Sequence, residues 1–257
     1  MTELERCIEF IRRIEDRAAA QREDFRFGVA HLNDRLPRVW SRNYLLAEKN
    51  LDTATAGLLA AEADRILGGA GLGHRKVEIN DAEVGERLDP GFRDLGWNVQ
   101  CDLIMVARRE PDVQADLSRV EEVHVEELEP AWAEGTRSEP YGSDEEVVEQ
   151  LVAANRVMME AVATRFFAAR VDGEIASYCD LYSEGRTGQI EAVMTLERYR
   201  NRGLARATVL RALAESRGAG DDLTFLMANR DDWPWKLYAK LGFDEIGCVY
   251  EFIRPSA

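Results

Sequence analysis

The chain repeats itself. When the 257-residue sequence is displaced by 146 residues, the separation of Gly57 and Gly203, residues from Gly57 to Gly96 fall on a similar second stretch without a gap. The matching pairs are Gly57 with Gly203, Leu58 with Leu204, Ala61 with Ala207, Arg65 with Arg211, Leu67 with Leu213, Ala82 with Ala228, Leu95 with Leu241 and Gly96 with Gly242. A repeat that preserves helix and turn positions predicts two copies of one structural unit.

The first copy shows alternating strand and helix patterns. Apolar residues from Leu4 to Ile14 recur at helical spacing, which predicts an amphipathic helix within Glu3 to Asp24. A second helix is predicted from Ala54 to Leu67, ended by a glycine cluster. The predicted strands are Phe25 to Ala30, Tyr44 to Ala47, Val77 to Ile79 and Asp102 to Val106.

The second copy begins after a polar linker, Glu110 to Gln114. Its predicted elements are a strand from Val120 to Val125, an irregular stretch from Trp132 to Gly142, a helix opened by a capping box at Ser143 to Glu146, and a hairpin of Arg165 to Arg170 with Ile175 to Tyr182 around Asp172-Gly173. We therefore predict an α/β (α+β) fold with a mixed sheet in each of two tandem domains, residues 1–112 and 118–257.

A strand, a polar loop and a helix follow one another from Gln189 to Ala207. The first turn of a helix has backbone N–H groups without partners and the positive end of the helix dipole, and a glycine there allows an anion to come close. Arg200 and Arg202 flank Gly203 in this turn. The pattern predicts a diphosphate site, although a tight turn with two solvated arginines has the same sequence.

Forty residues further on, the stretch from Asp231 to Phe243 ends in Leu237-Tyr238-Ala239-Lys240-Leu241-Gly242-Phe243. With the Arg200 to Ala205 loop, it resembles the GNAT acetyltransferase superfamily, whose pattern is an R/Q-x-x-G-x-G/A loop followed by L-Y-x-x-x-G-F; the resemblance covers roughly Val120 to Arg254. Two departures are Glu197, where the family usually has Pro, and Asp231, where it often has Asn.

The resemblance implies that acetyl-CoA binds where two parallel strands, around Val193 to Thr195 and Thr224 to Ala228, move apart. Amide groups of its arm would pair with the exposed backbone. The residues so assigned to acetyl-CoA are Val193, Met194, Thr195, Arg200, Asn201, Arg202, Gly203, Leu204, Ala205, Thr208 and Asp231. Thr208 is equally an ordinary helix residue.

The resemblance also assigns catalytic roles. Tyr238 stands where the family's tyrosine usually points at the sulfur of CoA, and a phenol of pKa ~10 is able to donate a proton to a thiolate. Glu191 shares a strand face with Gln189 and Val193 by period-two alternation and is the candidate base; an ordered water chain is the alternative. Glu126, Glu127 and Glu129 are expected to make the acceptor pocket acidic.

The first copy lacks this chemistry. Ala54 and Ala56 replace the two arginines, Leu59 replaces Ala205, and Phe92 replaces Tyr238. We interpret it as a degenerate GNAT-like domain that covers a sheet edge or walls part of the acceptor pocket.

Composition limits the functional classes. A net charge of −15 argues against nucleic-acid binding and is compatible with a cationic substrate. The four cysteines and three histidines have no metal-ligand spacing, so we expect no metal. No signal or membrane segment is evident, so we expect a cytoplasmic protein, either a monomer or a homodimer.

The predicted function is acetyl-CoA-dependent transfer of an acetyl group to a primary amine of a small molecule or peptide. A mycothiol-synthase-like enzyme and a non-catalytic acyl-CoA-binding regulatory module are the alternatives.

Overall fold

The computed structural model describes residues 1–255 and contains seven α-helices and eleven β-strands within that range. The helices are α1 (Glu3–Ala18), α2 (Ala56–Ala63), α3 (Ala82–Asp94), α4 (Val125–Arg137), α5 (Glu145–Ala161), α6 (Leu204–Gly218) and α7 (Pro234–Lys240). The strands are β1 (Gln21–Phe25), β2 (Gly28–Leu32), β3 (Tyr44–Ala47), β4 (Arg75–Ile79), β5 (Asn98–Ala107), β6 (Val120–Val123), β7 (Ala163–Val171), β8 (Glu174–Glu184), β9 (Thr187–Thr195), β10 (Leu223–Asn229) and β11 (Phe243–Arg254).

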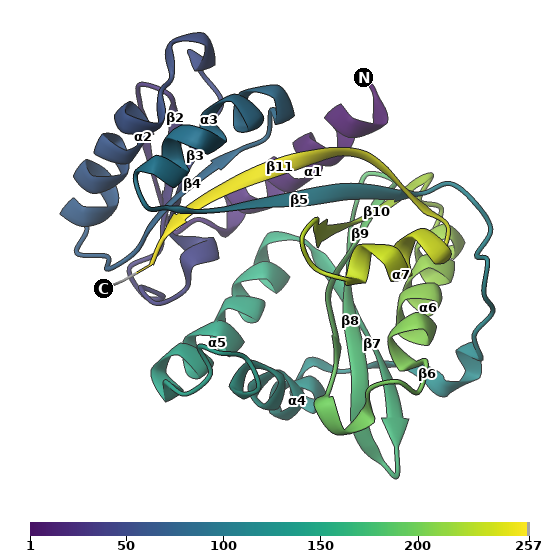
Figure 1. Ribbon diagram of the computed structural model, residues 1–257. Coiled ribbons are helices and arrows are strands. Elements are labelled where there is room, and N and C mark those ends of the chain that lie inside the picture. The colour runs from purple at the N-terminus through teal and green to yellow at the C-terminus, as the bar shows by residue number, and fades with distance from the viewer. Residues whose placement is uncertain (256–257) are drawn as a thin grey trace.

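All eleven strands form one mixed sheet in the order β1-β2-β3-β4-β11-β5-β10-β9-β8-β7-β6. The predicted mixed α/β class is therefore confirmed. Two long strands are exchanged between the halves: β5, from the first half, pairs with β10, and β11, from the second, pairs with β4. They also pair with each other and run side by side across the centre of the molecule (Figure 1). The sequence pattern did not predict this exchange, which joins the two copies into one sheet.

The sequence repeat corresponds to a repeat of structural elements. Displaced by 146 residues, α2 falls on α6, the end of α3 falls on α7 and β5 falls on β11. The exchange has the same symmetry, because each copy's last strand pairs with the other copy's last strand and with a strand of the other half. Residues 1–112 therefore supply a strand to the sheet of the second half.

Helices cover both faces of the sheet (Figure 1). Helices α2, α3, α6 and α7 contribute apolar residues to the largest core cluster, on one face. Helix α1 packs on the opposite face, where Cys7, Phe10 and Ile14 join buried residues of β5, β10, β11 and α5. Thr2 and Glu5 form a capping box at its start. Helix α1 thus contacts elements of both halves.

Three predictions of local structure are wrong. The stretch from Trp132 to Gly142, predicted to be irregular, begins inside α4, because burial of Leu128 and Trp132 against β7 and β8 outweighs the loss of a backbone hydrogen bond at Pro130. The expected single strand from Phe25 to Ala30 is divided by a turn at Arg26 and Phe27, so that Phe25 ends β1 and Gly28 begins β2. The cap of α5 is Asp144, whose side chain accepts from the Glu146 amide.

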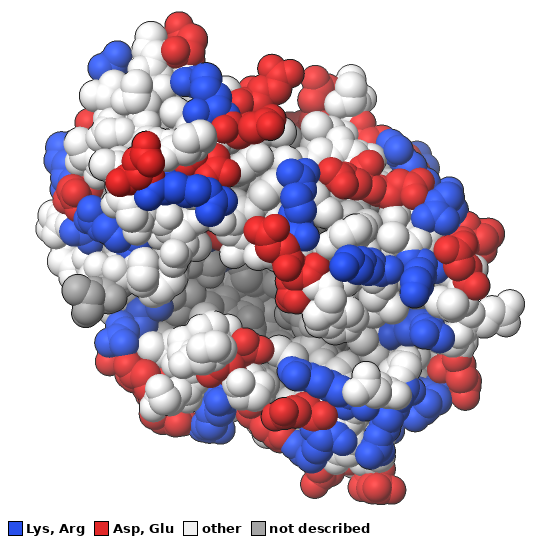
Figure 2. All heavy atoms as spheres, in the orientation of Figure 1, with Lys and Arg blue, Asp and Glu red and all other residues white. Residues whose placement is uncertain are grey.

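The predicted hairpin is present, with Asp172 and Gly173 at φ 53° and 86° in the turn between β7 and β8. Acidic and basic side chains are interspersed over the face drawn in Figure 2. None of the helices within residues 1–255 has both the length and the apolar character needed to cross a bilayer.

Candidate active site

The sheet opens between β9 and β10. These parallel strands pair from Thr187↔Leu223 to Ile190↔Leu226, and beyond that point their registers end. Beyond Ile190, β9 continues to pair with β8 through Glu191, Met194 and Thr195. This leaves the β10 side of that segment open to a ligand with amide groups, at the position expected from the sequence.

A donor-side cavity of about 670 Å³ lies at this opening, between the end of β9, the N-terminus of α6 and α7. It is lined by Val193, Met194, Thr195, Arg200, Asn201, Gly203, Leu204, Ala205, Arg206, Asp232, Trp233, Pro234, Leu237 and Tyr238. Nine residues named from the sequence are thus brought together: Val193, Met194, Thr195, Arg200, Asn201, Gly203, Leu204, Ala205 and Tyr238.

The wall of the donor-side cavity suits an anion. Asn201 and Gly203 both have left-handed backbone, with φ 63° and 75°, which turns the chain sharply into α6. No side chain within residues 1–255 caps α6, so its first N–H groups remain available to a ligand. Arg206, one turn into the helix, has a buried Nε without a hydrogen-bond partner among the described residues. A diphosphate would satisfy these donors.

Three predicted residues do not line this cavity. The Arg202 guanidinium lies over the Tyr199 ring, 5.5 Å from its centroid. Thr208 is fully buried and donates its hydroxyl hydrogen to the Ala205 carbonyl, so the predicted contact with acetyl-CoA does not fit this geometry. Asp231 lies outside the wall, and the neighbouring Asp232 lines it instead.

Tyr238 lines both the donor-side cavity and a third cavity, of about 240 Å³, between β9 and β10; we call this third cavity the passage. The passage is lined by Ile190, Glu191, Ala192, Val193, Leu226, Met227, Ala228, Asn229, Pro234 and Tyr238. Tyr238 is 7% exposed, and burial, followed by the nearby Glu191 carboxylate, raises its pKa well above the ordinary value. The phenol therefore stays protonated at neutral pH and is available as a donor.

Glu191 lies at the other end of the passage. A bulge follows it: Ala192 has φ 51°, and two residues of β9, Ala192 and Val193, lie opposite Cys179 of β8. The bulge interrupts the alternation of β9 side chains between the two faces of the sheet. Val193 therefore packs into the core on the α6 side, while Glu191 faces the opposite side. The predicted common face of Glu191 and Val193 is therefore wrong.

The environment of Glu191 suits a base. Burial is the main cause that raises its pKa to about 7, and it outweighs the hydrogen bond from the Gln189 amide to its carboxylate. A carboxylate with this pKa accepts protons near neutral pH.

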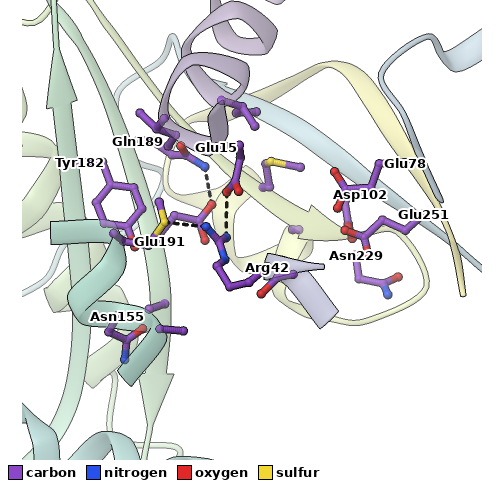
Figure 3. A pocket seen from close by; sticks show the side chains of 18 of the residues that line it. Glu15, Arg42, Glu78, Asp102, Asn155, Tyr182, Gln189, Glu191, Asn229 and Glu251 are labelled. Carbon is purple, nitrogen blue, oxygen red and sulfur yellow. Dashed lines mark hydrogen bonds and ion pairs between the residues drawn. The ribbon is translucent and has the colours of Figure 1, made fainter. Parts of the chain in front are cut away.

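An acceptor-side cavity of about 470 Å³ begins at Glu191, on the face opposite α6 (Figure 3). Both halves build it: Glu15, Arg42, Lys76, Glu78 and Asp102 come from the first half, and Asn155, Tyr182, Gln189, Glu191 and Glu251 from the second. The expectation that Glu126, Glu127 and Glu129 make this cavity acidic is wrong. None of the three lines it, and Glu127 and Glu129 pair with Arg170 and Arg156.

The equivalent place in the first half is filled. The Thr55 hydroxyl accepts from the Leu58 amide and so caps α2, and Arg87 donates to the Ala54 carbonyl. Phe92, the counterpart of Tyr238, is fully buried and stacks on Phe252. The N-terminus of α2 therefore has a side-chain cap that the N-terminus of α6 lacks within the described residues.

Sequence reasoning missed Arg206 and most of the acceptor-side cavity. Arg206 was detectable, because it stands three residues after Gly203 and so one turn along the same helix face. The acceptor wall offered no such signal, since Glu15, Glu78, Asp102 and Glu251 are far apart in the chain.

Replacing Gly203 with Val is expected to weaken acetyl-CoA binding at least tenfold. A Cβ at this position has no protein atom within 4 Å, so the added side chain would stand where the ligand approaches, and β-branching disfavours φ 75°. Calorimetric titration and melting temperature measure the effect. Gly220→Val is the matched control, since Gly220 has φ 95° and equal space but lies away from the cavity; equal loss of affinity in both variants would contradict the assignment.

A mixed sheet opened between two parallel strands, with an uncapped helix at the opening, is a ligand-binding α/β architecture. Residues 123–243 match the family described as "Acetyltransferase (GNAT) family". This part of the chain is a GNAT domain, and the resemblance noted from the sequence is confirmed.

Solved structures extend the likeness to the whole chain. A GCN5-related N-acetyltransferase from Kribbella flavida superimposes with a TM-score of 0.62 at 15% identity, over 99% of this chain and 96% of the other. A functionally unknown conserved protein from Staphylococcus epidermidis ATCC 12228 gives 0.66 at 14% identity, over 91% and 93%. A tandem GNAT protein from the clavulanic acid biosynthesis pathway gives 0.51 at 13%, over 78% and 70%. These likenesses show a shared fold, including the tandem arrangement. No curated protein sequence matches the chain.

Proposed function

We propose that the protein is an acetyl-CoA-dependent N-acetyltransferase that moves an acetyl group to a primary amine of a small molecule or peptide. The observation that supports this most strongly is the passage between β9 and β10. It shares Tyr238 with a donor-side cavity suited to a diphosphate and Glu191 with a separate acceptor-side cavity.

In this proposal the donor and the amine approach from opposite faces of the sheet. When bound, acetyl-CoA supplies the acetyl thioester. Its diphosphate would be held by the first amides of α6, Arg200 and Arg206, and its amide-bearing arm by the open edge of β9. Glu191 accepts the proton that an ammonium must lose before its nitrogen attacks. Tyr238 donates its hydroxyl hydrogen to the departing thiolate. The bulge at Ala192 aims Glu191 toward the amine and leaves Val193 on the donor side.

A panel of primary amines, assayed by release of free CoA, tests the proposed activity. Acetylation of any amine at a rate above spontaneous hydrolysis supports an enzyme. Tight binding of acetyl-CoA with no acceptor-dependent release from any amine would favour a non-catalytic binding module instead.

Acetyl-CoA is expected to bind once per chain. The first half lacks the arginines, its helix α2 is capped by Thr55, and Phe92 fills the place of Tyr238. Calorimetric titration measures the stoichiometry directly. Two comparable sites per chain would show that the first copy retains a donor site and would overturn this interpretation.

The cytoplasmic location and the lack of a metal also stay predictions. Within residues 1–255 no three His, Cys, Asp or Glu side chains group as metal ligands.

A further inference from the structure

The charges around the acceptor-side cavity do not balance. Five carboxylates line it, from Glu15, Glu78, Asp102, Glu191 and Glu251, against two cations, Arg42 and Lys76. Such an excess of one sign in a partly closed cavity favours a ligand of opposite charge.

The excess negative charge lies in two separate places. Near the passage, Arg42 forms an ion pair with Glu15, with 2.9 Å between Nη2 and Oε1. Glu191 has no cationic partner among the described residues. The Gln189 amide oxygen beside Glu191 also has no hydrogen-bond partner in the described chain, and Gln189 is only 4% exposed. A buried acceptor of this kind is satisfied by a ligand N–H.

The second place is the wall built by the exchanged strands. Lys76 Nζ lies 2.8 Å from Glu78 Oε1 and 2.9 Å from Glu251 Oε1, so one ammonium serves two carboxylates. Within the described residues, the Asp102 carboxylate accepts hydrogen bonds only from the Gln100 amide. In Figure 3, Glu78, Asp102 and Glu251 lie together on one side of the cavity, across Glu15 and Arg42 from Glu191 and Gln189.

The pKa values of two of these carboxyl groups are raised. Burial, followed by the Glu251 charge, raises the pKa of Asp102 to about 6. Burial also raises the pKa of Glu78 to about 7, although Lys76 opposes this. A bound cation would favour the ionised forms of both carboxyls.

We propose that the acceptor is a di- or polyamine, whose reacting nitrogen lies against Glu191 and Gln189 and whose second ammonium is bound by Asp102 with Glu78 and Glu251. This inference rests on the proposed acetyltransferase function and gives the degenerate first half a part in it: Asp102, on the exchanged strand β5, and Glu78, on β4, select the substrate. A carboxylate on the acceptor would meet like charge at this wall, so amino acids are disfavoured.

The test compares linear α,ω-diamines of increasing length with n-alkyl monoamines of equal length and with amino acids. We expect the wild-type protein to have a higher kcat/KM for a diamine than for its matched monoamine. In Asp102→Asn this preference is expected to fall about tenfold, since a charge-assisted contact to the second ammonium is lost. Asp244→Asn is the control, because Asp244 is a surface carboxylate paired with Arg109, and it leaves the preference unchanged.

The outcomes separate the two proposals. Amines acetylated without a preference for diamines, or a preference untouched by Asp102→Asn, would overturn the dication site while leaving the acetyltransferase in place. If no amine is acetylated, calorimetric binding of the diamine to the protein with CoA decides: binding that weakens in Asp102→Asn supports the site, and unchanged or absent binding refutes it.

Discussion

Tyr238→Phe is expected to lower kcat by about 10²-fold while the dissociation constant of acetyl-CoA barely changes. The substitution removes one hydroxyl that acts mainly when the thiolate departs, so it affects the transition state more than binding. Because burial and the Glu191 charge keep the phenol protonated, the loss is expected across the neutral range. Steady-state kinetics, beside calorimetric binding, measures the effect.

The fold should tolerate this change. Phe92 occupies the equivalent position in the first half and is fully buried there. Tyr250→Phe is a matched control, since Tyr250 is also 7% exposed but lines neither cavity nor the passage. Unchanged turnover in Tyr238→Phe would mean that Tyr238 is a packing residue. A collapse of its melting temperature would show a structural role and remove the assignment.

Glu191→Gln is expected to reduce kcat/KM by about 10²-fold or more, the usual contribution of a general base. The wild-type value should rise with pH through about 7, because the carboxyl must be ionised to accept a proton and burial sets its pKa there. The Gln variant should lack this rise. Deprotonation of the free amine adds a second rise at higher pH, which both proteins share.

A pH–rate profile of both proteins with one acceptor makes the comparison. Glu245→Gln is the control: this carboxylate lies on β11, pairs with Arg230 and faces solvent, and its removal should leave the profile intact. If the rise near pH 7 survives in Glu191→Gln, a water chain or another group is the base, and Glu191 serves only the charge of the cavity.

Local sequence patterns predicted the loop between β9 and α6 well. The residues from Arg200 to Ala205 are adjacent in the chain, so loop geometry and helix start follow from local preferences, and the cavity forms where the pattern placed it. The repeat likewise predicted equivalent helices, because apolar spacing and turn glycines encode them directly. Thr208 was placed wrongly because a helix position alone does not tell which face is buried.

Other features were set by packing between distant segments. Helix α4 contains Pro130, which local rules place outside a helix, and forms because its apolar face is covered by the sheet. The bulge at Ala192 breaks a strand alternation that the sequence alone reads as regular, and with it the faces of Glu191 and Val193 are separated.

By itself, the sequence determined the GNAT class, the repeat, the diphosphate-type loop and the loss of that loop's chemistry in the first copy, because each depends on residues near one another in the chain. The exchange of β5 and β11 depended on tertiary structure, since either copy's last strand has the pattern to fit beside β4 or β10. That exchange brings Asp102 and Glu251 into one wall. The acceptor-side cavity is therefore a property of the assembled sheet.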